Sequence, residues 1–87
     1  MSTTNRRIDI DLESDLEMDV PPGEPARATL ELVYEEDGGR TVTLERGEDE
    51  WILEFDENGR CVDRDPPTRQ LPGWVSKAIE LVEGELR

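Results

Sequence analysis

The chain contains no histidine, one cysteine, one lysine, one tyrosine and one phenylalanine in 87 residues. Histidine is the usual general acid or base near neutral pH, and the single thiol, Cys61, has no histidine to activate it. The sequence also lacks a glycine-rich phosphate loop, a nucleophile elbow and any zinc-ligand spacing. These absences predict a protein that is not an enzyme and that binds no cofactor.

The scarcity of cysteine and of long apolar runs bears on location. One cysteine cannot form an internal disulfide, which excludes a secreted disulfide scaffold. No apolar run approaches the roughly 20 residues that cross a bilayer. Met1 to Arg7 leads into Ile8-Asp9-Ile10-Asp11 rather than an apolar stretch, which is not the pattern of a signal peptide. We therefore expect a cytoplasmic protein with no membrane contact.

Acidic side chains are what the sequence has in excess. Twenty-three aspartates and glutamates stand against ten cations, of which Lys77 is the only lysine, and the formal net charge is −13. This balance is typical of a salt-adapted (halophilic) microbe, whose cytosol screens charge over about 3 Å at 1 M salt. We expect the chain to fold in concentrated KCl and to lose structure at low ionic strength. The same charge repels phosphates, which argues against direct nucleic acid binding.

Residues 1–25 form an acidic segment that predicts a strand followed by a proline-rich turn. Apolar residues occupy even positions from Ile8 to Leu12 and again from Leu16 to Val20, with acids on most odd positions, which is the period of a strand. The pattern fits one or two strands, with Glu13-Ser14-Asp15 as a break or an exposed turn. A helix is the alternative, since Ile8, Leu12, Leu16 and Val20 also lie four apart. The prolines of residues 21–25 then end any regular element.

Residues 26–87 predict one α+β domain, with an antiparallel meander over residues 28–64. The turn sequences are Asp37-Gly38-Gly39, Gly47-Glu48-Asp49 and Asn58-Gly59, of which the last is the strongest hairpin signal. A lone cysteine in a strand is most often a small buried apolar residue, and this is the interpretation of Cys61. The residues expected inward on the strands are Leu30, Leu32, Val42, Leu44, Trp51, Leu53 and Phe55.

A helix is predicted over residues 72–84, because apolar residues recur at helical spacing after Pro72 and Gly84 can end the helix. Its apolar stripe comprises Trp74, Val75, Ala78, Ile79, Leu81, Val82 and Leu86. A sheet with one apolar face needs a cover, and this helix is the one strong candidate. The predicted fold is therefore four to five antiparallel strands packed against one C-terminal helix.

The loop from Arg60 to Trp74 contains the candidate partner-binding residues Arg64, Arg69 and Trp74. Arginine and tryptophan concentrate binding energy at interfaces, so an exposed Trp74 would mark a recognition patch for an acidic or proline-rich partner. The alternative is that Trp74 anchors the helix in the core and the arginines pair with nearby acids. No metal site is predicted, because the residues from Glu54 to Asp65 depart from a calcium-binding loop at several ligand positions.

These observations predict a small noncatalytic interaction or regulatory protein, whose partner uses either the arginine-containing loop or an open strand edge. A homodimer through a sheet edge is one form of the second case. The alternative is an acidic mimic of nucleic acid that blocks a basic DNA- or RNA-binding protein. Its charges would be the row Asp9, Asp11, Glu13, Asp15, Glu17 and Asp19.

Overall fold

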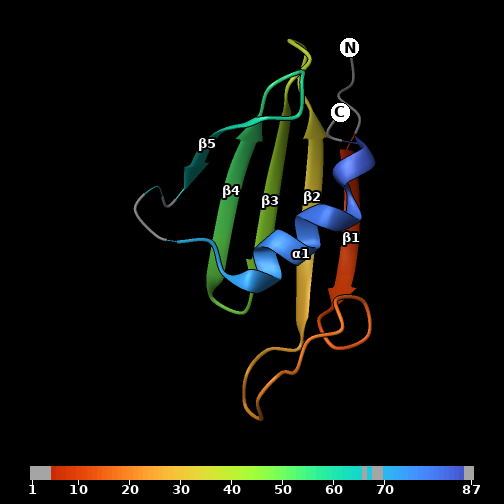
Figure 1. Cartoon of the computed structure of the whole chain (residues 1–87), viewed down its shortest axis with the longest axis vertical. Coiled ribbons are helices and arrows are strands. Elements are labelled where there is room, and N and C mark those ends of the chain that lie inside the picture. Colours follow the sequence, from red (N-terminus) through yellow and green to blue (C-terminus); the bar gives the residue numbers. More distant parts are fainter. Residues whose placement is uncertain (1–4, 66, 68–69, 86–87) are drawn as a thin grey trace.

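The computed structural model describes residues 5–65, 67 and 70–85. Within these residues the chain forms one antiparallel sheet with a helix across one face (Figure 1). Strands that follow one another in the sequence are also neighbours in the sheet, which confirms the predicted α+β meander. The strands are β1 (Asn5–Asp11), β2 (Arg27–Tyr34), β3 (Arg40–Arg46), β4 (Asp49–Phe55) and β5 (Cys61–Asp65), and the helix is α1 (Gly73–Leu81).

Two hairpin turns at one end of the sheet are built by glycine and aspartate together. Gly38 and Gly59 have φ angles of 91° and 83°, a backbone region that residues with a Cβ rarely adopt. Asp37 Oδ1 accepts a hydrogen bond from the Gly39 N–H at 2.8 Å, and Asp56 Oδ1 accepts two, at 2.9 Å each, from the N–H groups of Asn58 and Arg60. Both turns lie where the sequence predicts them.

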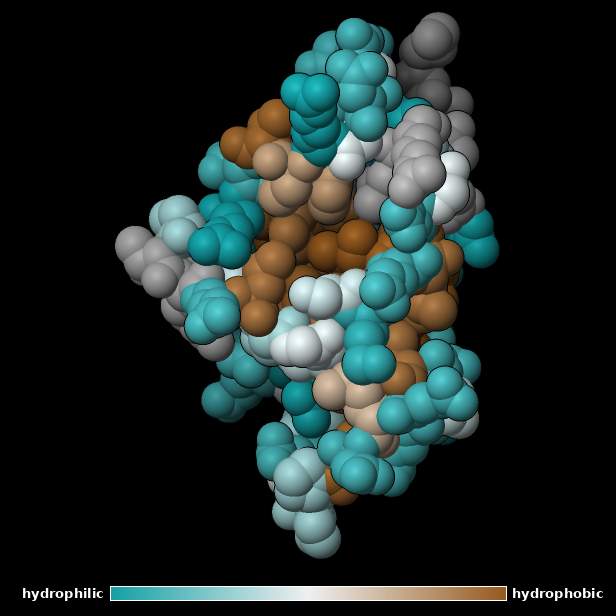
Figure 2. All heavy atoms as spheres, viewed as in Figure 1, coloured by the Kyte–Doolittle hydropathy of each residue, from teal (hydrophilic) through white to brown (hydrophobic). Residues whose placement is uncertain are grey.

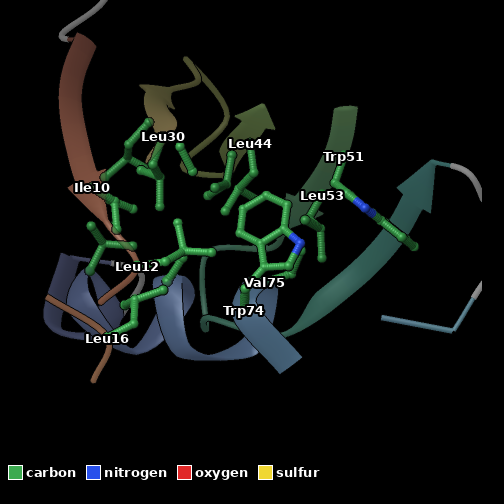
Figure 3. Close-up of a cluster of buried hydrophobic side chains, with 14 of the residues drawn as sticks. Ile10, Leu12, Leu16, Leu30, Leu44, Trp51, Leu53, Trp74 and Val75 are labelled. Carbon is green, nitrogen blue, oxygen red and sulfur yellow. The ribbon is translucent and has the colours of Figure 1, made fainter. Parts of the chain in front are cut away.

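Alternation along the strands sends one set of side chains to the helix-covered face, where they form the core (Figure 3). The register confirms the pairing of apolar rows across the sheet, as in Leu30 opposite Leu44 and Leu44 opposite Trp51. All seven strand residues expected inward are buried. Among the described residues, the buried apolar set is Ile10, Leu12, Leu16, Ala28, Leu30, Leu32, Val42, Leu44, Trp51, Leu53, Phe55, Trp74, Val75, Ala78 and Val82.

The helix begins after Pro72, whose φ of −64° and ψ of 154° make it the residue that precedes the first turn. It ends earlier than predicted, at Leu81, and a single 3₁₀ turn follows over Glu83–Glu85. The prediction for Leu81 is wrong, because its side chain is 47% exposed, and Ile79 is only partly buried. Leu86 lies outside the described residues. In the described part of the chain, no helix is long and apolar enough to span a membrane.

The N-terminal segment is part of the sheet, since β1 pairs with β2 along its whole length. The strand interpretation is correct as far as Asp11, and the turn considered at Glu13-Ser14-Asp15 is present, but residues 16–20 form no second strand. Asp11 Oδ1 accepts the N–H of Glu13 at 2.9 Å, and the Asp15 N–H donates to the Asp11 carbonyl oxygen at 2.7 Å. Leu12 and Leu16 are nevertheless buried, so this loop contributes to the core.

Arg46 joins three parts of the fold. Its Nε donates a hydrogen bond to the carbonyl oxygen of Pro25 at 2.8 Å, and its terminal nitrogen lies 3.8 Å from a carboxylate oxygen of Glu24. Its guanidinium also lies 6.0 Å from the ring centre of Trp74, near the outer limit for a cation–π contact. The loop before β2, strand β3 and the start of α1 are thus held at one point.

Replacing Leu12 with alanine tests the contribution of the N-terminal loop to the core. Leu12 is fully buried, and such truncations cost about 2–5 kcal/mol because a cavity remains. We expect Leu12→Ala to lower the free energy of unfolding, measured by urea denaturation, by this amount. Glu13→Ala, a truncation of the exposed neighbouring residue, should change it far less. Equal stability of the two variants would contradict this core assignment.

Like charges face each other on the uncovered side of the sheet. Glu45 of β3 lies opposite Glu50 of β4, and Glu54 of β4 lies opposite Asp63 of β5. All four residues are exposed. Directly opposed like charges destabilise a strand pair by a few tenths of a kcal/mol to about 1 kcal/mol, and salt screens this repulsion. The sheet is therefore expected to gain stability as the salt concentration rises.

Glu50→Lys tests this repulsion directly, because it places a cation opposite Glu45. We expect the substitution to raise the melting temperature by a few degrees in 0.1 M KCl and to have little effect in 2 M KCl. The wild-type melting temperature should itself rise with KCl. Glu13→Lys makes the same change in net charge without an opposed strand residue, and should stabilise less. A wild-type melting temperature independent of salt would refute the argument.

Candidate functional site

The helix is too short to cover the whole apolar face of the sheet. Nine helical residues extend about 13 to 14 Å, whereas five strands at about 4.8 Å spacing span roughly 19 Å. In Figure 1, α1 crosses in front of β3, β2 and β1, and β5 lies to one side of it. Figure 2 shows apolar surface in the hollow between α1 and the β4–β5 side of the sheet. The described residues therefore leave a region beside β5 incompletely covered.

This region contains an open groove of about 450 Å³, which we call the β5 groove. One wall is β5 itself, and the other comes from the segment that leads into α1. Apolar atoms provide more of the lining than polar atoms do. The lining residues are Cys61, Val62, Asp63, Arg64, Pro67 and Leu71.

Strand β5 is an edge of the sheet, because it pairs with β4 on one side and with no other strand among the described residues. An edge strand presents backbone donors and acceptors along its outer side, which are available to a further strand. The pairing with β4 shifts register between Glu54 and Phe55. Within β5, Val62 is 64% exposed, the largest exposure of any large apolar side chain in the described part of the chain.

A second hollow, also of about 450 Å³, adjoins the groove at the end of the sheet that carries the β2–β3 and β4–β5 turns. We call it the acidic cleft. Its wall includes Phe55 and Val62, so Val62 lines both hollows. Its carboxylates belong to Glu35, Asp37, Glu54, Asp56 and Glu57.

The cation in the wall of the acidic cleft, Arg40, is turned toward the protein. Its guanidinium lies 4.8 Å from the ring centre of Tyr34 and donates hydrogen bonds to the carbonyl oxygens of Gly38 and Gly39. Glu35 accepts a hydrogen bond from the Thr41 hydroxyl at 2.9 Å. The outer carboxylates, including those of Glu54 and Glu57, are exposed to solvent.

The three residues predicted to bind a partner have different positions. Arg64 is half-buried in the β5 groove, on the same face of the sheet as Leu53, which lies opposite it. Trp74 is only 3% exposed and packs in the core, which excludes the exposed role considered for it and agrees with the alternative of a helix anchor. Arg69 lies outside the described residues. Sequence reasoning did not identify Val62, because its exposure follows from the position of β5 at the edge.

Cys61 is exposed in the β5 groove, so its interpretation as a buried apolar residue is wrong. Its Sγ lies 3.4 Å from the carbonyl oxygen of Asp63 and donates a hydrogen bond to it. Partial desolvation raises the pKa of the Cys61 thiol, the Asp63 carboxylate adds to this effect, and the Arg64 guanidinium opposes it. The thiol is therefore accessible without being an activated nucleophile.

The acidic row proposed as a nucleic acid mimic does not extend along one strand. Asp9 and Asp11 belong to β1, but Glu13, Asp15 and Glu17 lie in the loop after it. Asp15 Oδ2 accepts a hydrogen bond from the Asp11 N–H at 2.8 Å, so this carboxylate stabilises the turn. Among the described side chains, no group of three or more histidines, cysteines or carboxylates is arranged to hold a metal ion.

Comparisons with protein-family models, with curated proteins and with solved structures find no match to this chain.

The reactivity of Cys61 tests the description of the groove. Because the pKa is raised, a smaller fraction of the thiol is ionised at pH 8 than in the unfolded chain. We expect neutral iodoacetamide to alkylate the folded protein more slowly at pH 8 than the protein in urea. The half-maximal rate of the folded protein should lie at higher pH. Faster alkylation of the folded protein would show that Arg64 outweighs desolvation.

Proposed function

We propose that this protein is a small noncatalytic binding module that captures an extended segment of a protein partner along the edge of β5. One observation carries the proposal: the exposed apolar side chain of Val62 stands on an unpaired sheet edge, between two hollows. Addition of a strand to such an edge gives affinity through backbone hydrogen bonds and specificity through neighbouring pockets. The lack of histidine in the sequence supports a role in binding rather than catalysis.

A second copy of this chain is the competing occupant of the same edge. Two copies would bring together molecules that each carry a charge of −13, which opposes association unless salt screens it. A partner segment of neutral or positive charge meets no such repulsion. The loop position of the acids after Asp11 gives the nucleic acid mimic less support than the strand edge has.

We infer that the working environment is the concentrated salt of a halophilic microbe's cytoplasm. The excess of acids, the near absence of lysine and the opposed pair of Glu45 and Glu50 support this inference together. Where charges are screened within a few ångströms, repulsion between carboxylates is weak and destabilises the fold little. The proposal of a binding module does not depend on this setting, because the β5 edge and its groove are features of packing.

Selection of displayed peptides provides the test of the binding proposal. A library of random twelve-residue peptides is selected against the folded protein in 1 M KCl, and the affinities of recovered peptides are measured by fluorescence anisotropy. We expect Val62→Glu to weaken binding at least tenfold, because a carboxylate replaces the apolar contact. Leu81→Glu, the same change at the exposed apolar site on α1, should alter affinity less than twofold.

Circular dichroism must show that both variants fold. Recovered peptides that bind the Val62→Glu variant as tightly as the wild type would contradict a site at the β5 edge. Failure to recover any peptide would contradict the proposal as well. A wild-type dimer in analytical ultracentrifugation that Val62→Glu converts to monomer would assign the edge to a second copy instead.

A further inference from the structure

The surface along β5 changes character from one end to the other. At the turn end lies the acidic cleft, in the middle stands Val62, and beyond it the groove contains the half-buried Arg64. Val62 lines both hollows, so a segment that lies along β5 and contacts Val62 is next to both of them. This order of charge and apolar contact distinguishes the segments that fit.

The lining of the cleft suits a long cationic side chain. Phe55 and Val62 supply apolar contacts in its wall, while Glu54 and Glu57 place exposed carboxylates around it. Lysine and arginine side chains bury an apolar stem and keep the charged head in a polar environment. Arginine can in addition bind a carboxylate through two parallel hydrogen bonds. A metal ion would contact the carboxylates alone, because it has no apolar part to pack against Phe55 and Val62.

The position of the cleft beside the strand edge adds a geometric constraint. Residues two apart on an extended segment point to the same side and are separated by about 6.5 to 7 Å. A segment paired with β5 therefore offers one side chain to Val62 and a nearby one to the cleft. The resident cation, Arg40, lies over the Tyr34 ring and donates to backbone carbonyl oxygens, and Glu54 and Glu57 in the lining of the cleft are exposed to solvent.

We propose that the segment bound at β5 carries a lysine or arginine that enters the acidic cleft, next to an apolar residue that packs on Val62. This inference rests on the proposed function and specifies the chemistry of its partner: a basic and apolar extended segment. The carboxylates of the cleft select the cationic residue, and the unpaired edge holds the backbone of the segment.

The peptides recovered in 1 M KCl test this chemistry. At this salt concentration the Debye length is about 3 Å, so the general attraction between a basic peptide and an acidic protein is removed, and direct contacts remain. The double variant Glu54→Gln/Glu57→Gln removes two carboxylates from the cleft. Its matched control, Glu48→Gln/Glu50→Gln, removes one exposed acid from a turn and one from β4 at the opposite end of that strand.

We expect the recovered peptides to be enriched in lysine or arginine beside an apolar residue. Their affinity should fall at least fivefold in the cleft variant and less than twofold in the control variant. Replacing the cationic residue of the peptide with norleucine, which keeps an apolar stem, should weaken binding to the wild type and abolish the difference between the two protein variants. This coupling locates the cation in the cleft.

Other results would overturn the inference in distinguishable ways. Peptides that lose affinity with Val62→Glu but not with Glu54→Gln/Glu57→Gln would refute the cationic residue while leaving the β5 site in place. Equal losses in the cleft and control variants would show a general charge effect and no specific contact. Peptides unaffected by Val62→Glu would refute the β5 site itself, and the inference with it.

Discussion

The packing of α1 across one face of the meander is the contact on which the rest of the structure depends. An antiparallel sheet with one apolar face is stable only when that face is covered, and α1 brings Trp74, Val75 and Ala78 onto it. The buried loop residues Leu12 and Leu16 complete the same core. Because one short helix must cover five strands, the cover is incomplete on the β5 side. Strand β5 thus lies beside the helix, and its groove is lined by β5 and by the segment that leads into α1.

The charged residues are divided between structural and solvent-exposed positions. Asp37 and Asp56 accept backbone hydrogen bonds in their turns, where the chain would otherwise leave N–H groups without partners. Arg40 and Arg46 each combine a hydrogen bond to a carbonyl oxygen with an aromatic ring contact, which suits the planar guanidinium better than the ammonium of lysine. Acids such as Glu45 and Glu50 remain exposed and determine how the protein responds to salt.

The sequence predicts the sheet well because its turns and its alternation agree. Asn58-Gly59 and the alternating residues of β2 to β4 each specify the same local structure. The alternation continues past Asp11, however, and there it misleads, because hydrogen bonds between Asp11 and Asp15 turn the chain while Leu12 and Leu16 still reach the core. Glu13-Ser14-Asp15 marks the turn, but the alternation does not show that Leu16 and the residues after it form a loop and not a second strand.

The candidate site was less predictable because it depends on the position of elements in the whole fold. Cys61 and Val62 have the composition of a buried strand, and they are exposed because β5 has one strand neighbour and α1 does not cover it. Arg64 is predicted from its residue type and does line the groove, whereas the same reasoning applied to Trp74 selects a core residue. Composition identifies binding residue types, but edge position decides which of them are accessible.

The order of the strands in the sheet also has a consequence for the rate of folding. Each strand pairs with its neighbour in the sequence, so three of the four pairings close only a short turn. The exception is the pairing of β1 with β2, whose connection spans residues 12–26. Closure of short turns is fast, which favours early formation of the hairpins of β2 to β5. Closure of the core by β1, its following loop and α1 would then be the late step of folding.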